Sequence, residues 1–446
     1  MLNKNKPTEA NLGLVFFPAF DWKISATHPE RQERLLYTRD QLLEEGLLEH
    51  PAIREYNPLL ASWQDIERVH VGAPSLQKWV TEAHRVSVGG AIAAAEAVMR
   101  GEVKRAFSLV RPPGHHAMTM VHGIRGFCTV NVEAIMIAYL RRHYEVKRVA
   151  IVDTDVHHGD GTQDVFYHDP DTLFISFHQD GRTLYPGTGF MYEYGGPQAV
   201  GSTVNIPLPP GTGDEGMLKV LQELVLPMLA DFQPDIIINS AGQDNHFSDP
   251  LANMLVTAKG YARLTDLLQA DIAVLEGGYS VQEALPYVNT GIVLSMAGLD
   301  YSQVIEPAFD AYSNRQRGDV TQRIDGIIKQ WQQQWQCRHE MQVDALLGLG
   351  DYWHDQHQIY YDETGISEYR KETIRLYPDK VGWHSIDSRS DGGPFGSQHV
   401  FATFIPWQAD EACRRDAYEA TWAAKKTGTA QRYVVVDSMK DIQEEL

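Results

Sequence analysis

The segment Val149–Gly161 reads VAIVDTDVHHGDG and places an apolar run directly before a cluster of aspartates and histidines. A continuous apolar run of this length is typical of a strand that is buried on both faces, as in a parallel sheet. In extended chain, residues two positions apart point to the same side, so Asp153, Asp155 and His157 can face one site. Burying such carboxylates is costly unless a positive charge meets them. The segment therefore predicts a strand that ends in a site for a cation.

The same arrangement recurs along the first two thirds of the chain, where short apolar runs alternate with helix-length stretches. This alternation predicts a mostly parallel α/β sheet with helices on both faces, in which ligands bind beyond the carboxyl ends of the strands. The predicted strands are Leu12–Phe17, Ala106–Val110, Val149–Asp153, Thr172–His178, Asp235–Ser240 and Ile272–Leu275, and the predicted helices are Ser87–Arg100, Asn131–His143 and Glu215–Leu229.

The pattern changes after about Asp310. Apolar residues within Ile324–Trp335 recur at helical spacing, and two strand-like runs, Val400–Ile405 and Tyr433–Val436, flank a predicted helix over Asp410–Lys425. No motif in this part suggests a role. We therefore expect a catalytic domain over residues 1–310 and a smaller C-terminal α+β appendage over residues 311–446, with a loop over Asp387–Ser397.

Composition narrows the classes of function. The formal net charge of −20 argues against binding to nucleic acid phosphates. Cys128, Cys337 and Cys413 lack a CxxC spacing, which excludes a disulfide framework or a thiolate zinc site and favours a reducing compartment. The apolar runs are too short to cross a bilayer, and the start MLNKNKPTEANLG has no apolar segment before a cleavage site. We expect a cytoplasmic protein that binds neither nucleic acid nor membrane.

Three further strand ends carry chemistry. One predicted strand runs into AGQD, whose Asp244 can complete a site with Asp155 and His157. Three protein ligands leave a coordination position open, which is typical of catalytic metal sites; Asp244 by itself would more often cap a helix. The other two segments are RPPGHHA (Arg111–Ala117) and LEGGY (Leu275–Tyr279).

The histidines of RPPGHHA suit proton transfer near neutral pH. Each histidine needs an acceptor that orients it, and Asp153 and Asp160 are spare carboxylates for that purpose. A second pair of metal ligands, or structural histidines, is an equally good interpretation of His115 and His116 alone. In LEGGY, Tyr279 can donate a hydrogen bond to an oxyanion, although a tyrosine after a strand more often packs in the core.

Together these segments resemble the histone deacetylase family, including the acetylpolyamine amidohydrolases, in family order over residues 12–300. The resemblance implies an arginase-like α/β fold and a class II-like deacetylase with one catalytic Zn²⁺, which Fe²⁺ can replace, and a structural K⁺. The segments that carry it are HPERQER (His28–Arg34), RPPGHHA, GFC (Gly126–Cys128), DTDVHHGDGTQ, YPGTG (Tyr185–Gly189), SAGQD followed by DPL, and LEGGY.

The resemblance also implies a role for each matching residue. Asp155, His157 and Asp244 would bind the catalytic metal. The other implied roles are His116 as general base, His115 as its electrostatic partner, Asp153 and Asp160 as carboxylates that orient these histidines, Tyr279 as the hydroxyl that polarises the carbonyl, Gly126, Phe127, Tyr185 and Leu251 along the substrate tunnel, Arg34 in the acetate exit channel, and Asp153, Ser176 and main-chain oxygens of Asp155, His157 and Phe177 around K⁺.

The expected substrates are acylated lysine in a peptide or protein, or a small acylated amine. Leu251 stands where polyamine-specific relatives carry an acidic gatekeeper, which favours acyl-lysine or another neutral acylamide. The loop between His116 and Gly126 is longer than is usual in the family, and we expect its His122 and Arg125 at the rim of the site. An acetylpolyamine amidohydrolase and a catalytically silent acyl-lysine binder remain as alternatives, and a homo-oligomer stays open.

Overall fold

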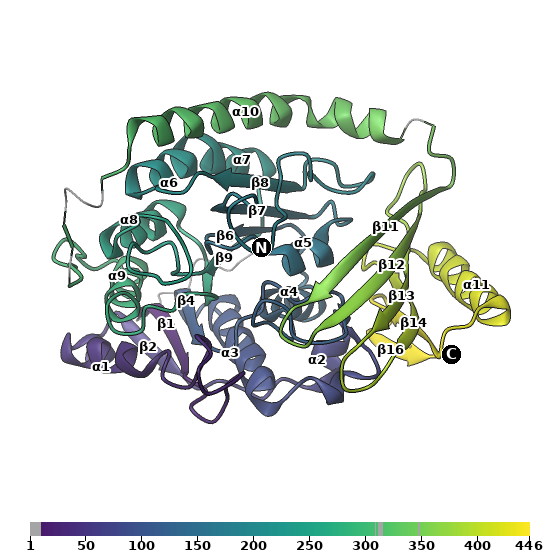
Figure 1. Ribbon diagram of the computed structural model, residues 1–446, viewed down its shortest axis with the longest axis horizontal. Helices are drawn as coiled ribbons and strands as arrows, with labels where there is room; N and C mark the ends of the chain where they lie inside the picture. Colours follow the sequence, from purple (N-terminus) through teal and green to yellow (C-terminus); the bar gives the residue numbers. More distant parts are fainter. Residues whose placement is uncertain (1–9, 308, 311–314, 347) are drawn as a thin grey trace.

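An eight-stranded sheet lies at the centre of the computed structural model, which describes residues 10–307, 309–310, 315–346 and 348–446 (Figure 1). All neighbouring strands in this sheet run parallel, which confirms the predicted α/β architecture. Residues 1–9, which hold most of the start used for the export prediction, lie outside the described residues. In spatial order the strands are β2 (Ile53–Tyr56), β1 (Ala10–Phe17), β4 (Val103–Val110), β10 (Ile272–Leu275), β9 (Ile236–Ala241), β6 (Val149–Asp153), β7 (Thr172–Gln179) and β8 (Thr203–Leu208).

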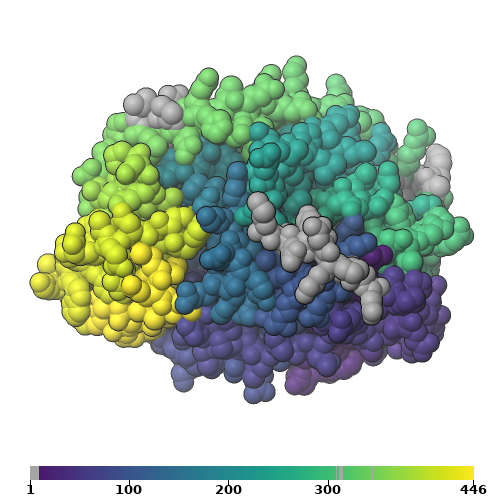
Figure 2. Space-filling model, turned by 180° about the vertical axis from the view of Figure 1, so that it is seen from behind, coloured from purple at the N-terminus to yellow at the C-terminus, as the bar shows by residue number. Residues whose placement is uncertain are grey.

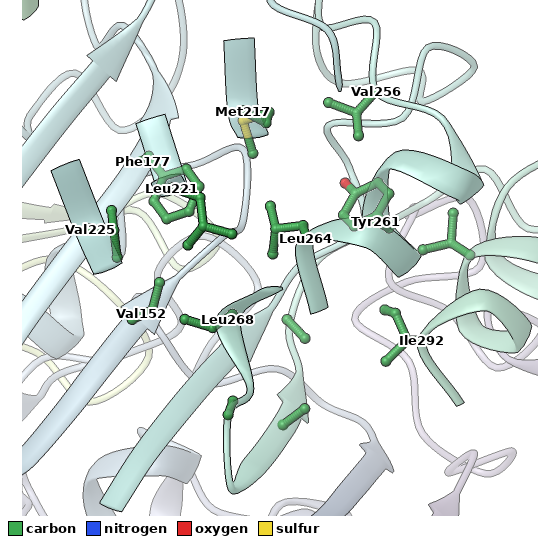
Figure 3. Packing of buried hydrophobic residues seen from close by; sticks show 14 of the residues in the cluster. Val152, Phe177, Met217, Leu221, Val225, Val256, Tyr261, Leu264, Leu268 and Ile292 are labelled. Carbon is green, nitrogen blue, oxygen red and sulfur yellow. The ribbon is translucent and has the colours of Figure 1, made fainter. Parts of the chain in front are cut away.

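Helices cover both faces of the sheet because its central strands send alternate side chains into two hydrophobic clusters. Val152 packs in one cluster with Leu221 and Leu268 (Figure 3), whereas its neighbour Ile151 joins Ile135 in the other. The helices are α1 (Leu36–Glu44), α2 (Trp63–Glu67), α3 (Glu82–Met99), α4 (Val132–Tyr144), α5 (Asp160–Phe166), α6 (Asp214–Val220), the π-helical turn η3 (Leu221–Val225), α7 (Leu226–Phe232), α8 (Ala258–Leu268) and α9 (Leu285–Ala297), with short 3-10 turns η1 (Leu47–Glu49) and η2 (Leu76–Lys78).

The predicted helix over Asn131–His143 begins at a side-chain cap. Asn131 caps α4, and its side chain accepts a hydrogen bond from the main-chain N–H of Ala134 at 2.9 Å. The strands β2 and β8 were not predicted. β2 is a short edge strand with two exposed residues, and Asn205 and Pro207 interrupt the apolar run of β8.

The C-terminal residues form a second sheet, seen as a yellow lobe beside the rest of the molecule in Figure 2. Helix α11 joins its strands β14 and β15, which confirms the predicted pair of strands that flank a helix. The two strands run parallel, as is usual for strands connected through a helix. The predicted loop over Asp387–Ser397 is wrong in its first part, which belongs to β13. In spatial order the sheet contains β11 (Tyr352–Tyr361), β12 (Ile366–Arg375), β13 (His384–Asp391), β14 (Gln398–Ile405), β15 (Arg432–Asp437) and β16 (Ile442–Glu445), and α11 spans Glu411–Thr427.

Helix α10 (Gly318–Leu346) lies across α6 and belongs to the core of the first sheet (Figure 1). Ile324, Ile328 and Trp331 are buried in the cluster that contains Val152, and the Trp331 indole N–H donates to the main-chain oxygen of Asn205 at 2.7 Å. The predicted apolar stripe is therefore confirmed, and it faces the core of the first sheet.

The second sheet docks on a two-stranded ribbon, β3 (Val71–Gly72) and β5 (Met120–Val121). Val71 and Met120 pack in one hydrophobic cluster with Ile386 of β13, and the Tyr361 hydroxyl donates to the main-chain oxygen of Met120 at 2.5 Å. The loop that carries β5 also carries His122 and Arg125, so the C-terminal sheet lies directly against the histidine loop. Within the described part of the chain, no helix combines the length and apolar character needed to span a bilayer.

Candidate active site

The strands that carry the chemical motifs are neighbours in the sheet, in the order β4, β10, β9 and β6. Because these strands are parallel, their carboxyl ends meet at one edge of the sheet. The loop after β6 carries Asp155 and His157, and the loop after β9 carries Asp244. The loops after β4 and β10 carry His116 and Tyr279. The topology therefore gathers the predicted site residues at one place.

The side chains of Asp155, His157 and Asp244 converge. His157 Nδ1 lies 3.1 Å from Asp155 Oδ1 and 3.1 Å from Asp244 Oδ2, and the ligand atoms of the three residues lie within 4.8 Å of one another. Both carboxylates are fully buried, so desolvation and mutual repulsion favour a cation between them. Two carboxylate oxygens and one imidazole nitrogen suit Zn²⁺ or Fe²⁺ and leave a coordination position open. These residues fit the expected metal.

Gly277 of the LEGGY segment explains how the backbone approaches this triad. Its main-chain N–H donates to Asp155 Oδ2 at 2.6 Å. A Cβ atom at this position would overlap the Asp244 carboxylate and come within 2.5 Å of Asp155 Oδ2. The glycine is therefore required for the close packing of the loop after β10 on the carboxylates.

The two histidines of RPPGHHA lie in different electrostatic environments. His115 Nδ1 lies 3.1 Å from Asp153 Oδ2, and His116 Nδ1 lies 2.7 Å from Asp160 Oδ1. Burial opposes a charge on His115, but the Asp155 and Asp153 carboxylates outweigh it and raise its pKa to about 10. Burial and the neighbouring positive charge of His115 lower the pKa of His116 to about 4, although Asp160 opposes this. His116 is thus the neutral member of the pair, and its Nε2 can accept a proton.

Arg125 connects the carboxylate partner of His116 to the C-terminal sheet. Its Nε donates to Asp160 Oδ2 at 2.8 Å, and its Nη1 donates to the main-chain oxygen of Tyr360, at the end of β11, at 2.5 Å. Burial opposes ionisation of Asp160, but Arg125 and His116 hold its pKa well below the ordinary value. Arg125 was expected at the rim. It is instead buried in the network behind His116.

Aromatic rings stand beside the histidines and the triad. The Phe127 ring lies edge-on to the Tyr279 ring with centroids 5.4 Å apart, and the Tyr185 ring lies edge-on to His116 at 5.2 Å. Gly126 has a φ of 47°, and a Cβ atom there would come within 2.5 Å of the His116 ring and 2.8 Å of Tyr185. Phe127 adopts a φ of 73°, which is strained for a side chain of this size.

The turn after β11 holds this strained segment from the C-terminal side. Asp362 Oδ1 accepts hydrogen bonds from the Gly126 main-chain N–H at 3.1 Å and from the Tyr185 hydroxyl at 2.9 Å. Strained backbone persists where surrounding contacts hold it in place. The β11–β12 turn therefore fixes two of the residues expected along the tunnel.

A second carboxylate of the same turn reaches the N-terminal segment. Glu363 Oε1 lies 3.2 Å from His28 Nε2, and the His28 ring lies edge-on to Phe127 at 4.2 Å. Three segments that are far apart in the sequence, around residues 28, 127 and 363, thus meet beside the same aromatic ring.

Tyr279 is held through its backbone and its ring. Its main-chain N–H donates to Asp249 Oδ2 at 2.7 Å, and the Arg34 guanidinium lies 4.8 Å from the centroid of its ring. Arg34 also donates to the main-chain oxygen of Gly278 at 2.7 Å and to Glu30 Oε2 at 2.8 Å. Burial raises the pKa of the Tyr279 hydroxyl well above its ordinary value, so the hydroxyl keeps its proton.

The residues expected around K⁺ and at the gatekeeper position lie close to the site. Asp153 and Ser176 are register partners on β6 and β7 and are fully buried, and Asp153 Oδ1 accepts the main-chain N–H of Asp155 at 3.0 Å. Leu251 lies in the loop after β9, where its main-chain N–H donates to Asp249 Oδ1 at 2.9 Å. Asp249 thus connects the Leu251 turn to the Tyr279 segment.

The sequence did not reveal every residue that holds this site together. Glu276 Oε2 accepts the main-chain N–H groups of Gly114 at 2.8 Å and His115 at 3.0 Å, and only its place in LEGGY signals it. The carboxylates of the β11–β12 turn carry no motif. The rim position expected for His122 is wrong: its ring is buried, and its Nε2 lies 2.7 Å from Ser388 Oγ of β13.

Comparison with known proteins supports this picture. The histone deacetylase domain family matches residues 74–295. A probable deacetylase of Archaeoglobus fulgidus is 45% identical over 323 residues, which cover 66% of this chain and 89% of that protein. A histone deacetylase-like amidohydrolase of Pseudomonas aeruginosa is 33% identical over 340 residues, which cover 69% of this chain and 88% of that protein. Among solved structures, the HDA15 HD domain has a TM-score of 0.64 at 28% identity and covers 76% of this chain and 99% of its own. The chain therefore belongs to the histone deacetylase family and is a metal-dependent deacetylase, a hydrolase that acts on the amide bonds of acylated substrates.

Proposed function

We propose that this enzyme uses Zn²⁺ to remove acetyl or related acyl groups from lysine side chains. The observation that carries the proposal is the convergence of Asp155, His157 and Asp244 beside His116, whose Nδ1 is occupied by Asp160. A bound Zn²⁺ would polarise the amide carbonyl and lower the pKa of water to ~7.

His116 transfers the proton in the proposed reaction. Its Nδ1–H is held by Asp160, so its Nε2 carries the lone pair that takes a proton from the attacking water. The same nitrogen then gives the proton to the amine as the C–N bond breaks. His115, whose Nδ1 lies 3.1 Å from Asp153 Oδ2, stands beside His116 as its electrostatic partner.

Tyr279 and the aromatic walls act on the substrate. The Tyr279 hydroxyl keeps its proton and donates a hydrogen bond to the oxyanion. Phe127 and Tyr185 enclose the apolar stem of the acylated side chain and exclude water from the reacting carbon. The apolar Leu251 side chain offers no charge to a second amine, which favours acyl-lysine.

A second candidate substrate class is an acylated polyamine, and the β11–β12 turn favours it. Asp362 and Glu363 place two carboxylates of the appendage beside Gly126, Tyr185 and His28. These charges suit a cationic amine at the rim, even though Leu251 is apolar. The two candidates differ in the charge carried beyond the scissile amide.

Hydrolysis of an acetyl-lysine peptide and of N8-acetylspermidine by the Zn²⁺-loaded enzyme tests both. We expect a higher kcat/KM for the peptide. The Tyr279→Phe variant should keep its metal but lose turnover by about 100-fold or more. A preference for acetylspermidine selects the second candidate. Peptide binding without hydrolysis of either substrate, with metal bound, would contradict both and identify a silent binder.

A further inference from the structure

A second group of metal-ligand side chains lies between the catalytic part of the chain and the C-terminal sheet. His168 follows α5 in the catalytic part, Glu372 lies on β12, and His384 begins β13 (Figure 1). The ligand atoms of these three residues lie within 4.8 Å of one another. We propose that they bind a divalent transition metal such as Zn²⁺, which joins the two parts of the molecule.

The spacing of the ligand atoms suits a metal. Glu372 Oε2 lies 3.1 Å from His384 Nε2 and 3.6 Å from His168 Nε2. Ligands at zinc distances in a tetrahedral arrangement are roughly 3.3 Å apart. The catalytic triad has separations of 3.1 Å between His157 and its two carboxylates. The spacing of the ligand atoms in the second group is therefore similar to that in the catalytic triad. The second group has two imidazoles and one carboxylate, whereas the triad has one imidazole and two carboxylates.

The backbone sets up this arrangement. Glu372 pairs with Ile386 and His384 pairs with Ile374 in the β12–β13 register, so Glu372 and His384 project from the same face as diagonal neighbours. The rings of His168 and His384 lie with centroids 5.0 Å apart. The two rings therefore come together only because the C-terminal sheet docks against the part of the chain that carries His168.

Charge also favours a cation here. Among the residues that the structure describes, the carboxylates of Glu368, Glu372 and Asp164 surround the Arg370 guanidinium, at distances of 2.5 to 3.3 Å. These side chains are buried or nearly so. With the neighbouring histidines neutral, these three carboxylates exceed the one arginine by two negative charges, which a divalent ion would balance.

Arg370 also decides which oxygen of Glu372 remains for a metal. Its Nη1 lies 3.3 Å from Oε1 of Glu372 and 2.5 Å from Asp164. It therefore occupies the space between these two carboxylates, where His357 offers a further ligand atom. The opposite oxygen, Oε2, faces the two histidines. An arginine that holds the non-coordinating oxygen would orient the ligand, as hydrogen-bonded partners do in other metal sites.

The site has an entry route and an open position. His168 and His384 line a cavity of about 450 Å³ between the two parts, together with Trp407 and Gln408. Three protein ligands leave a fourth position, which water from this cavity can fill. Because the ligands come from both parts of the molecule, we assign the metal a structural role at their contact.

Metal stoichiometry tests the proposal. The untagged full-length protein is stripped with a chelator, dialysed against Zn²⁺ and analysed by plasma mass spectrometry. We expect about two equivalents in the wild type, and about one in His384→Ala and in His168→Ala. The exposed His354→Ala on β11 is the matched control and should keep both. Asp244→Asn, which removes a ligand of the catalytic triad, should keep one.

The Asp244→Asn variant isolates the second site from the catalytic one. Zn²⁺ should raise its melting temperature, and Co²⁺ should give it the visible absorption of a nitrogen- and oxygen-ligated ion. Both effects should vanish in the Asp244→Asn, His384→Ala double variant. One equivalent in the wild type and none in Asp244→Asn would overturn the proposal and leave the catalytic site intact. Circular dichroism verifies the fold of each variant, and agreement between the two histidine variants, one on each side of the contact, excludes a local folding defect.

Discussion

The Asp362 carboxylate accepts a hydrogen bond from the Tyr185 hydroxyl at 2.9 Å, although the two residues are 177 positions apart. Asp362 lies in a hairpin of the C-terminal sheet, and Tyr185 belongs to the YPGTG segment of the catalytic part. The same carboxylate oxygen holds the main-chain N–H of Gly126. The appendage thus contributes directly to the walls of the candidate tunnel.

Replacement of Asp362 should loosen both walls. We expect Asp362→Ala to lower kcat/KM on an acetyl-lysine peptide by about tenfold, because two hydrogen bonds to a charged acceptor are lost. The loss should lie mainly in KM, since Asp362 does not contact the metal ligands. Steady-state kinetics of Asp362→Ala and of the exposed control Asp355→Asn on β11 check this. Equal kinetics for both variants and the wild type would refute the role.

Arg125 should set the pH dependence of His116 through Asp160. Without the guanidinium, no positive charge compensates the Asp160 carboxylate. The carboxylate then favours the protonated form of His116 more strongly, and the pKa of His116 rises. Because the reaction needs neutral His116, the acid limb of the kcat/KM profile of Arg125→Gln should move to higher pH. The rate at neutral pH should change little through this effect, because the pKa of His116 starts from about 4. An unchanged acid limb would show that Arg125 acts only as a structural support.

The sequence predicted the parallel sheet because its strands are buried on both faces and read as unbroken apolar runs, as in Val149–Val152. The sequence also predicted that the motifs meet at one site, because the carboxyl ends of parallel strands lie at the same edge of a sheet. The C-terminal sheet was harder to predict. β11 reads YWHDQHQIYY, and most of its residues are exposed. A strand of this kind in an antiparallel sheet has no apolar run that reveals it.

Long-range contacts marked the limit of prediction at the site. Nothing in the segment Asp362–Thr364 indicates that it reaches Gly126, since its contacts depend on how two sheets dock. His122 and Arg125 were visible as an unusual loop, but the sheet that covers them was not. Their burial therefore could not be predicted, and both were expected at an exposed rim.

Gly277→Ala should abolish metal binding at the catalytic triad. The added methyl group would overlap the Asp244 carboxylate and crowd Asp155, so the two ligands would have to separate. Zinc analysis of the purified variant checks this against Gly326→Ala. Gly326 is exposed on α10 with open space around its Cβ position, so alanine there should retain metal and stabilise the helix by about 0.5–1 kcal/mol. Normal zinc content in Gly277→Ala would contradict the close-packing argument.

Glu368 should make the stability of the C-terminal sheet sensitive to acid. Burial opposes its ionisation, but Arg370 and then His122 outweigh this and hold its pKa at about 2, below the ordinary 4.5 expected in the unfolded chain. Its stabilisation is therefore complete above pH 4.5 and is lost as the pH falls toward 2, with a maximum of about 3 kcal/mol. Glu368→Gln should flatten this part of the stability profile in urea titrations across pH 2–7, whereas the exposed Glu419→Gln on α11 should follow the wild type. A Glu368→Gln profile as steep as that of the wild type would place the acid sensitivity elsewhere in the molecule, because only a group whose proton affinity changes on folding can generate such a slope.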